Sequence, residues 1–482
     1  MRYHKLTHAA TGLALALSAS ACDQGLTGLN DNPNAPTDVS APFLFPQGVT
    51  ALVGLTRGAG YDLTMTSLWA QHFAKIQYVD EDTYWIRSQS IDAYWNAFYS
   101  GGLQDLTLVI EKTADRPGLA GPAHVMKQWA FGQMTDTWGD IPYSEANQGA
   151  ANITPAYDAQ ADIYAGILST LNQANDMMAT ATEDYGSADP IYAGDLDNWQ
   201  KFANSLRLRY AMRMSNVDEP TARAEIQAAL AEAAGVFESN ADNAMLQWPG
   251  DGTNDNPFYT NFRTRDDHRV SATMVDTLAS LSDPRLAVYA RPTQDPPNGY
   301  VGVPNALENP TLLGLTKTSK IGTAFSEQDS PSVLMHYAEV ELILAEAAAR
   351  GFAGVTGTAA EHYEAGIRAS MEMYGIDEAD IVAYLGQPEV QLGTGVGGDD
   401  LTKIALQKWI ALYGQGIEAW AEWRRTGVPA LEVGPAAIID EVARRLTYPG
   451  TEQSFNGANL DAAVGSLDGG DDLTSRVWWD VP

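Results

Sequence analysis

Residues 333–374 of the chain read VLMHYAEVELILAEAAARGFAGVTGTAAEHYEAGIRASMEMY. Alanine, leucine and glutamate dominate both ends of this stretch, and glycines interrupt its middle. The pattern predicts two helices, at 333–350 and 359–374. Thr358 and Glu361 have the spacing of a capping box, which marks the start of the second helix. A short connection places two helices side by side, so the stretch predicts a helical hairpin.

Helical patterns of the same kind recur along most of the chain. They cover 91–112 and 123–137, 158–180 and 198–216, 221–234, and 401–413 and 417–425. The residues 115–118 (DRPG) separate the first two as a loop, and Asp197 with Gln200 resembles a second capping box. Strand signals are sparse. The sequence therefore predicts an all-α fold, a tetratricopeptide-like scaffold of about four helix pairs.

Two regions depart from the helical pattern, at about 240–332 and 427–482. Glycine, proline, asparagine and aspartate are frequent there, and in the first region only 271–281 looks helical. Long irregular segments inside a compact domain are usually functional or disordered. Because the first region contains Trp248, Tyr259, Phe262, Tyr289 and Tyr300, we expect it to be ordered.

Composition excludes several classes of protein. The 482 residues include one cysteine, and 29 lysines and arginines stand against 61 aspartates and glutamates, for a net charge of −32. One cysteine rules out a disulfide scaffold and any site that needs several thiolates. A nucleic-acid partner is not expected, because phosphate backbones are bound by clustered lysine and arginine. With 45% hydrophobic residues the chain is not globally disordered.

The N-terminus predicts export and a lipid anchor. Arg2 and Lys5 precede an apolar stretch at 9–19, which is typical of a secretory signal peptide over residues 1–21. Residues 19–22 (ASAC) resemble a bacterial lipobox, so Cys22 becomes the lipidated first residue, followed by a tether to residue 42. The alternative is a plain secretory signal with an incidental cysteine. We expect the remaining residues, 43–482, to form the helical domain.

Catalytic and metal-binding patterns are weak. The sequence has no HExxH motif and no GxSxG motif. Asp136 and Glu145 lie close in sequence, as a glycosidase pair would, although turns and helix caps also use such carboxylates. Residues 251–256 (DGTNDN) resemble a calcium loop but lack its glycine at position six and its glutamate at position twelve. We therefore expect no catalysis and no obligatory cofactor, with calcium as an open alternative.

Residues 77–87 (QYVDEDTYWIR) alternate aromatic with charged side chains. An aromatic face binds the C–H groups of a sugar, and carboxylate or guanidinium groups bind its hydroxyls. We therefore nominate Tyr84 and Trp85 as a platform for a ligand, with Asp80 and Arg87 as polar partners. The alternative is a partly buried junction between helices. Candidates of second rank from the irregular region are Tyr300, Phe262 and Arg265.

Several ordered stretches together resemble the SusD/RagB family of outer-membrane nutrient-binding lipoproteins. The stretches are 29–37 (LNDNPNAPT), 135–146 (TDTWGDIPYSEA), 157–164 (YDAQADIY), 197–213 (DNWQKFANSLRLRYAMR), 283–286 (DPRL), 337–351 (YAEVELILAEAAARG), 407–429 with its WRRTGVP, and 477–480 (VWWD). The resemblance implies a helical-repeat scaffold that packs against a SusC-like TonB-dependent β-barrel, with irregular loops forming the ligand face. It implies structural roles for Trp138, Asp140, Pro142, Trp423 and Arg424.

The resemblance makes the main hypothesis a lipid-anchored protein at the outer-membrane surface. It would bind an oligomeric nutrient, most plausibly a neutral glycan, and deliver it to the barrel. Three alternatives remain: a RagB-like protein that binds oligopeptides, a surface glycosidase using Asp136 and Glu145, and a structural adaptor without a soluble ligand.

Overall fold

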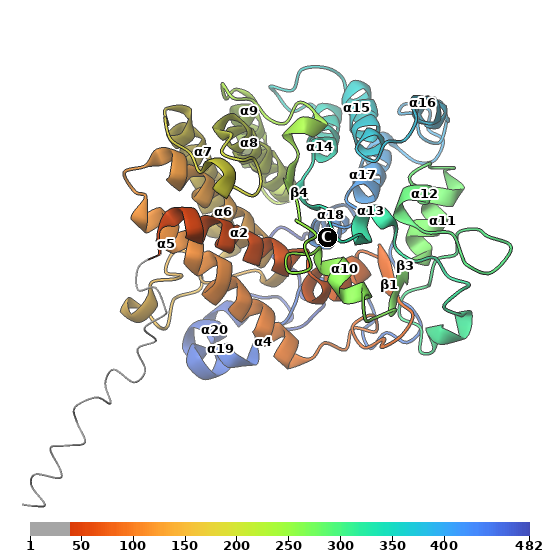
Figure 1. Ribbon diagram of the computed structural model, residues 1–482, viewed down its shortest axis with the longest axis horizontal. Coiled ribbons are helices and arrows are strands. Elements are labelled where there is room, and N and C mark those ends of the chain that lie inside the picture. Colours follow the sequence, from red (N-terminus) through yellow and green to blue (C-terminus); the bar gives the residue numbers. More distant parts are fainter. Residues whose placement is uncertain (1–38) are drawn as a thin grey trace, which may run out of the picture. The chain divides into compact units, whose positions relative to one another are not determined.

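A computed structural model describes residues 39–482, and residues 41–482 form one compact unit (Figure 1). The expected signal peptide, Cys22 and most of the expected tether lie outside the described residues. Within residues 39–482, no helix combines the length and the apolar character that crossing a membrane requires.

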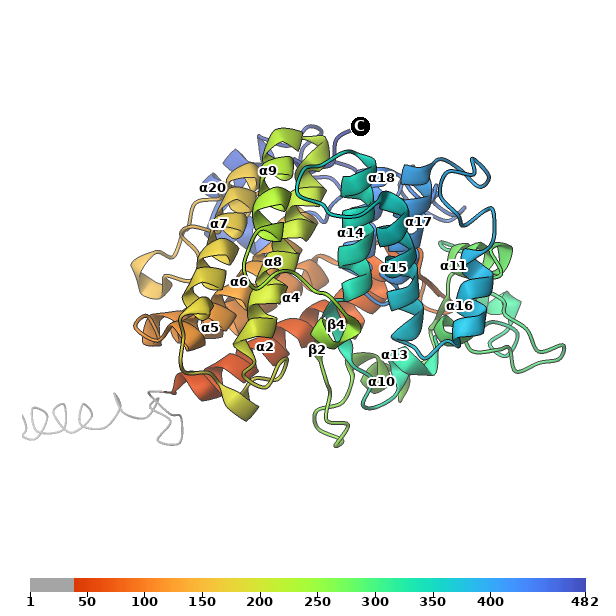
Figure 2. The ribbon, with the colours of Figure 1, turned by 90° about the horizontal axis from the view of Figure 1, so that it is seen from above.

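The four predicted helix pairs are present, and their members pack against each other. They are α5 (Gln104–Lys112) with α6 (Pro117–Trp138), α7 (Gln160–Ala179) with α8 (Leu196–Arg213), α14 (Tyr337–Ala349) with α15 (Ala359–Glu372), and α17 (Asp400–Ala411) with α18 (Gly416–Thr426). Figure 2 shows helices of these pairs standing side by side. The prediction of an all-α, tetratricopeptide-like fold is confirmed.

Further α-helices lie outside these four pairs. The helices are α2 (Ala41–Thr56), α3 (Ser67–Trp69), α4 (Ser88–Ala97), α9 (Glu219–Leu230), α10 (Pro257–Phe262), α11 (Ala272–Ser280), α12 (Leu286–Tyr289), α13 (Thr323–Ser326), α16 (Glu378–Leu385), α19 (Gly450–Phe455) and α20 (Gly457–Val464). The expectation that 271–281 is the only helix of the irregular region is wrong, because α10, α12 and α13 also form there. Each of these three has at most six residues, which is too short for a visible helical period.

Helix α6 begins at Pro117, inside the stretch that the sequence assigned to a loop. Proline is favoured in the first turn of a helix, because its missing N–H has no intrahelical partner there. The predicted capping box at Asp197 is also displaced. Asp195 is the N-cap of α8, and its carboxylate accepts the N–H of Asn198.

Residues 333–335, where the sequence predicts the start of a helix, are not helical. Residues Ser332–Met335 form strand β4, which pairs antiparallel with β2 (Ala244–Leu246). Helix α14 then starts after His336, whose Nδ1 accepts the N–H of Glu339 at 2.9 Å. At the second helix the prediction holds, since Thr358 and Glu361 form the full capping box of α15.

Two segments are π-helices, with one residue more per turn than an α-helix. They are η1 (Ala59–Thr66) and η2 (Phe98–Leu103). Helix α4, η2 and α5 follow one another without a break, and Gly101 in η2 leaves helical geometry with φ −96° and ψ −112°. The helix predicted at 91–112 is therefore present, but it starts at Ser88 and is interrupted by η2.

A buried network of charges joins four helices. Arg209 on α8 binds Glu339 on α14 at 2.6 Å and Glu418 on α18 at 3.0 Å. Arg213, one turn further along α8, binds Glu418 and Asp136 on α6. Because all five side chains are almost fully buried, each charge depends on its partner for the solvation it has lost.

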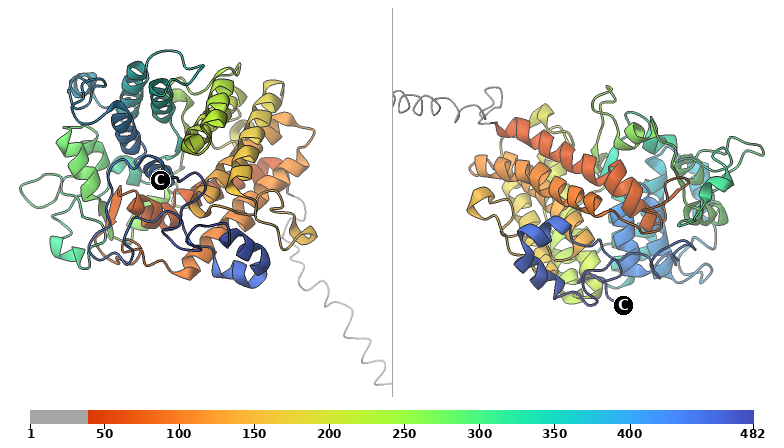
Figure 3. Two further views of the ribbon diagram at one scale, coloured as in Figure 1. Left: turned by 180° about the vertical axis from the view of Figure 1, so that it is seen from behind. Right: turned by 90° about the horizontal axis from the view of Figure 1, so that it is seen from below.

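The motif residues that resemble the family are packing residues here. Trp138 is buried, and its Nε1 donates to the carbonyl of Thr447 at 3.0 Å. The Arg424 guanidinium lies 3.6 Å above the ring of Trp420 and 4.6 Å above that of Trp479, so it is held between two rings. Figure 3 shows the C-terminal segment, in blue, lying across this side of the helices.

Candidate functional site

Strand pairing brings the predicted platform segment next to the irregular region. Strand β1 (Phe73–Lys75) pairs antiparallel with β3 (His268–Val270), and Lys75 stands opposite His268. The residues that follow β1 and those that precede β3 therefore leave the sheet at the same end. This places 78–87 beside 261–267.

A pocket of about 510 Å³ lies where these segments meet. Its walls come from η1, from the loop between β1 and α4, and from the segment between α10 and β3. The lining residues are Ala59, Gly60, Thr64, Lys75, Tyr78, Asp80, Glu81, Arg87, Asn261, Arg265 and Asp267. We call this cavity the platform pocket. It contains three of the nominated residues, namely Asp80, Arg87 and Arg265.

Two exposed aromatic rings belong to this surface. Tyr78 is 68% exposed and lines the pocket, and the Arg265 guanidinium lies 5.2 Å from the centre of its ring. Trp85 is 51% exposed and borders the pocket through Arg87, whose guanidinium lies 5.5 Å from the indole. Exposed rings with adjoining charged groups can contact both the apolar faces and the hydroxyls of a sugar.

Tyr84 does not belong to the exposed surface, which corrects its nomination as half of the platform. Its side chain is only 3% exposed, and its ring stacks on Trp69 with 6.1 Å between the ring centres. Burial raises the pKa of its phenol well above the ordinary value. The backbone explains the error: Tyr84 adopts φ +67°, which turns neighbouring side chains away from simple alternation.

Ion pairs organise the floor and the rim of the pocket. Asp80 and Arg87 form an exposed pair at 2.7 Å. Lys75 is buried, with its ammonium 3.8 Å from Glu81 and 3.6 Å from Asp267. Arg265 binds the same Asp267 at 3.3 Å. The arrangement offers a ligand both acceptors and donors at fixed positions.

The loop that carries Asp80 is held in place by hydrogen bonds to the buried side chain of Asp82. Its carboxylate accepts the backbone N–H of Lys75 at 3.1 Å and the Nδ2–H of Asn305 at 2.8 Å. Burial raises the pKa of Asp82 to about 6, and the hydrogen bond from Asn305 opposes that rise.

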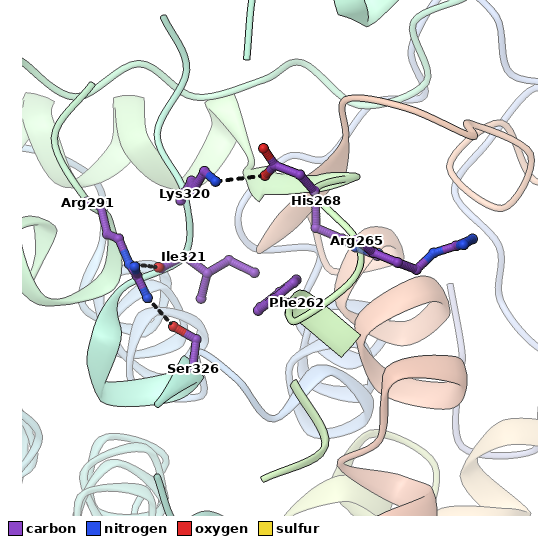
Figure 4. A pocket seen from close by; sticks show the side chains of 8 residues that line it. Phe262, Arg265, His268, Arg291, Lys320, Ile321 and Ser326 are labelled. Atoms are coloured by element: carbon purple, nitrogen blue, oxygen red, sulfur yellow. Dashed lines mark hydrogen bonds and ion pairs between the residues drawn. The ribbon is translucent and has the colours of Figure 1, made fainter. Parts of the chain in front are cut away.

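A second, smaller pocket of about 140 Å³ adjoins the first and shares Arg265 with it. Figure 4 shows Phe262 facing Ile321 across this space, with Arg291 and Lys320 on one side. Arg291 donates to the carbonyl of Ile321 at 2.9 Å and to Ser326 Oγ at 2.7 Å. Lys320 binds Asp266 at 3.0 Å.

His268 lines the smaller pocket from β3 and is buried. Burial and the nearby charge of Lys75 together lower the pKa of its imidazole to about 4, so the ring is neutral at pH 7. Of the candidates of second rank, Phe262 lines the smaller pocket and Arg265 lines both pockets. Tyr300 lines neither of them.

Several residues of the platform pocket were missed by sequence reasoning. Lys75 and Asp267 sit at the ends of β1 and β3, and Asn261 lies on α10. Nothing in the local sequence marks them, because they are brought together by the pairing of two three-residue strands, Phe73–Lys75 and His268–Val270, that are far apart in the sequence. Tyr78 was within the quoted segment but was not nominated.

The carboxylates considered for catalysis are occupied by structural bonds. Asp136 is fully buried and bonds to Arg213, to Tyr164 Oη at 2.5 Å and to Trp479 Nε1 at 2.8 Å. Glu145 accepts Asn152 Nδ2 and the N–H of Ala156. A buried, fully bonded Asp136 has no access to a substrate, so this pair does not form a glycosidase site.

The residues that resemble a calcium loop, 251–256, use their carboxylates in hydrogen bonds to their own backbone. Asp251 accepts the N–H groups of Thr253 and Asn254, both at 2.8 Å, and Asp255 accepts the N–H of Gly252. Across residues 39–482, no group of three or more histidine, cysteine, aspartate or glutamate side chains could hold a metal ion.

Comparison with known proteins identifies the family. The family model described as "Starch-binding associating with outer membrane" matches residues 33–449. The chain therefore belongs to the SusD-like family, which confirms the resemblance found in the sequence. Among curated proteins, none matches this chain.

Solved structures with the same fold include chitin-binding proteins. One, described as a chitin-binding protein, is 30% identical, with a TM-score of 0.80 over 91% of this chain and 100% of its own. A chitin-binding SusD homologue from Flavobacterium johnsoniae is 27% identical, with a TM-score of 0.80 over 90% and 98%. A SusD homologue from Bacteroides uniformis is 26% identical, with a TM-score of 0.81 over 91% and 100%.

Proposed function

We propose that the protein captures a neutral oligosaccharide at the platform pocket. The observation that carries this proposal is the convergence of exposed Tyr78 with Asp80, Arg87 and Arg265 around one cavity, with exposed Trp85 beside Arg87 at its edge. Sugar sites combine an aromatic face with a few oriented polar groups in this way. Chitin oligosaccharides are the first ligands to test, because two relatives of the same fold are described as chitin-binding.

The proposed role is uptake rather than catalysis. A lipid on Cys22 would hold the protein at the outer-membrane surface, and a SusC-like TonB-dependent barrel would receive the captured glycan. The family description, which places starch binding at the outer membrane, supports this proposal. The experiment for the anchor is to compare the wild type with Cys22→Ser. We expect the variant to lose incorporation of radiolabelled palmitate and to leave the membrane fraction.

Ligand binding is tested by titrating the purified protein with chitohexaose, other neutral oligosaccharides, galacturonic acid oligomers and oligopeptides, by calorimetry. We expect saturable binding to one neutral glycan. Trp85→Ala should weaken that binding about tenfold, which corresponds to about 1.4 kcal/mol. Phe43→Ala is a matched control, because Phe43 is an exposed aromatic residue on α2 that does not line the pocket.

The same titration separates the alternatives. Binding of oligopeptides alone would replace this proposal with a RagB-like role. Release of new reducing ends from a polysaccharide would show a glycosidase. A glycan affinity that Trp85→Ala leaves unchanged would remove the platform pocket from the proposal.

A further inference from the structure

A separate cavity of about 300 Å³ lies between η2, the loop 142–155 and α19. None of its lining residues belongs to the platform pocket. We call it the π-helix pocket, after η2, which supplies Tyr99 and Ser100 to its wall. Its volume is within the range of pockets that hold small ligands. Figure 1 shows α4 and α19 close to each other in this part of the molecule, and these two helices are in contact.

The pocket is built by unusual backbone geometry on both sides. On one side η2 widens the helix, and Gly101 departs from helical angles. On the other side Asn147 and Gly149 adopt left-handed φ values of +60° and +57°. The Nδ2 of Asn147 donates to the carbonyl of Tyr99 at 2.8 Å and to Gln104 Oε1 at 3.2 Å, which ties the loop to the helix. Such π-helices and left-handed residues cluster at functional sites.

The platform pocket shows the same construction. Its wall includes Ala59, Gly60 and Thr64 of η1. Both π-helices of the described residues therefore line a cavity. Tyr94 on α4 donates to the carbonyl of Gly60 at 2.9 Å, and the adjacent residue, Trp95, lines the π-helix pocket. One helix thus supports a wall of each cavity.

The chemistry of the π-helix pocket favours a neutral, hydroxylated ligand. Tyr99 contributes a partly exposed ring, which packs against the buried ring of Trp95 with 5.1 Å between ring centres, and side-chain amides come from Asn96, Gln104, Gln148 and Asn152. An amide both donates and accepts hydrogen bonds, which suits a row of sugar hydroxyls. The lining contains no lysine, arginine or histidine, and Glu452 contributes a negative charge. An acidic ligand would therefore meet repulsion without a compensating cation.

Glu452 is held in place and keeps one oxygen available. Its Oε2 accepts Tyr157 Oη at 2.8 Å and Asn456 Nδ2 at 3.3 Å. The other carboxylate oxygen accepts no hydrogen bond from any residue in the described part of the chain. It can accept a hydrogen bond from a hydroxyl group of a bound sugar.

We infer that the π-helix pocket is a second binding site for a neutral oligosaccharide. Arg87 at the N-terminus of α4 lines the platform pocket, and Tyr99 lines the π-helix pocket twelve residues later. That spacing corresponds to about 18 Å along a helix axis. Two sites that one long chain occupies together raise its affinity over that of a short one, because the second contact becomes intramolecular.

The test is a calorimetric titration of the purified protein with neutral trisaccharides from chitin, starch and cellulose. We expect two equivalents bound by the wild type, and Trp85→Ala should weaken one of the two sites about tenfold while the other keeps its affinity. Adding Gln104→Ala and Gln148→Ala to Trp85→Ala should weaken that other site at least tenfold. Gln173→Ala is the matched control, because Gln173 is an exposed glutamine on α7, outside both pockets. Asn96→Trp, at an exposed position, fills the π-helix pocket without removing any buried contact.

Each outcome decides between the two sites. One equivalent in the wild type, with an affinity that Trp85→Ala weakens about tenfold, would overturn the second site and leave the proposed function intact. Binding in Trp85→Ala that survives both Asn96→Trp and the two glutamine substitutions would also overturn it. A tripeptide or a galacturonic acid trimer bound at the second site would overturn its assignment to neutral sugars. No binding of any neutral trisaccharide by the wild type would overturn both proposals.

Discussion

Two neighbouring aromatic residues, Tyr84 and Trp85, differ sharply in environment. Tyr84 is packed against Trp69 in the core, and Trp85 is half exposed beside Arg87. The residue type alone does not predict which of the two is exposed, because tyrosine and tryptophan both occur in cores and in binding sites. The backbone reversal at Tyr84 decides which ring faces the solvent.

This contrast predicts opposite effects of two adjacent substitutions. Tyr84→Ala should lower the free energy of unfolding by about 3 kcal/mol or more, since it removes a buried ring. Trp85→Ala should change it by less than about 0.5 kcal/mol, as for most surface substitutions. Urea denaturation followed by circular dichroism measures both. Equal losses of stability would show that Trp85 is a packing residue and would withdraw it from the binding surface.

A buried aspartate gives a prediction for pH dependence. Asp62 is fully buried, and its Oδ1 accepts Ser67 Oγ at 2.6 Å, Gly416 N at 3.0 Å and Thr66 Oγ1 at 3.3 Å. Burial raises its pKa to about 6, although the positive charge of Arg57 opposes the rise. The folded protein therefore holds this proton up to a higher pH than the unfolded chain does.

The contribution of Asp62 to stability is complete below its unfolded pKa, 3.8, and is lost as pH rises to about 6. The loss amounts to about 3 kcal/mol by linkage. Asp62→Asn keeps the three bonds to Oδ1 and removes the titration. We expect the difference in unfolding free energy, variant minus wild type, to increase between pH 4 and pH 7. A difference that stays constant over this range would contradict the raised pKa.

At the scale of elements, the N-terminal cap of α15 makes a measurable contribution to stability. Thr358 Oγ1 accepts the N–H of Glu361, and the Glu361 carboxylate accepts the N–H of Thr358 at 2.8 Å. Thr358→Ala should cost about 1 kcal/mol of stability, whereas Thr358→Ser keeps the hydroxyl and should cost little. Hydrogen exchange of the first turn of α15 measures the effect. Similar exchange rates in the two variants would show that the cap contributes nothing.

The sequence predicts the long helices well because caps, turns and apolar spacing are local signals. It predicts the short elements poorly. Strand β4 was absorbed into a predicted helix, since its four residues stabilise a strand only when β2 lies beside them. The sequence predicts only part of the candidate site, because some of its residues come together only through contacts between distant segments. Asp80 and Arg87 lie in a conspicuous segment, but Lys75 and Asp267 become site residues only through the pairing of β1 with β3.

At the scale of the whole molecule, the buried charge network is the main link between distant helix pairs. Arg209→Met should lower the free energy of unfolding by about 3–5 kcal/mol, because Glu339 and Glu418 would each lose a partner in the core. Arg368→Met is the control, since Arg368 is a partly exposed arginine of α15 paired with Glu372 and Glu378. It should cost about 1 kcal/mol or less. Thermal unfolding compares them, and an equal shift in Tm for both would contradict this role of the network.

The same charge network affects when the chain can fold during its synthesis. Arg213 is synthesised 205 positions before Glu418, which neutralises it together with Arg209. Until the ribosome has produced α18, Arg209 can pair only with Glu339 and Arg213 only with Asp136, so both guanidinium groups of α8 lack the carboxylate that they share in the folded protein. We therefore expect nascent chains that end before residue 416 to remain loosely folded and sensitive to protease. A chain that closes its core only near the end of synthesis would suit the proposed export, in which it crosses a membrane unfolded.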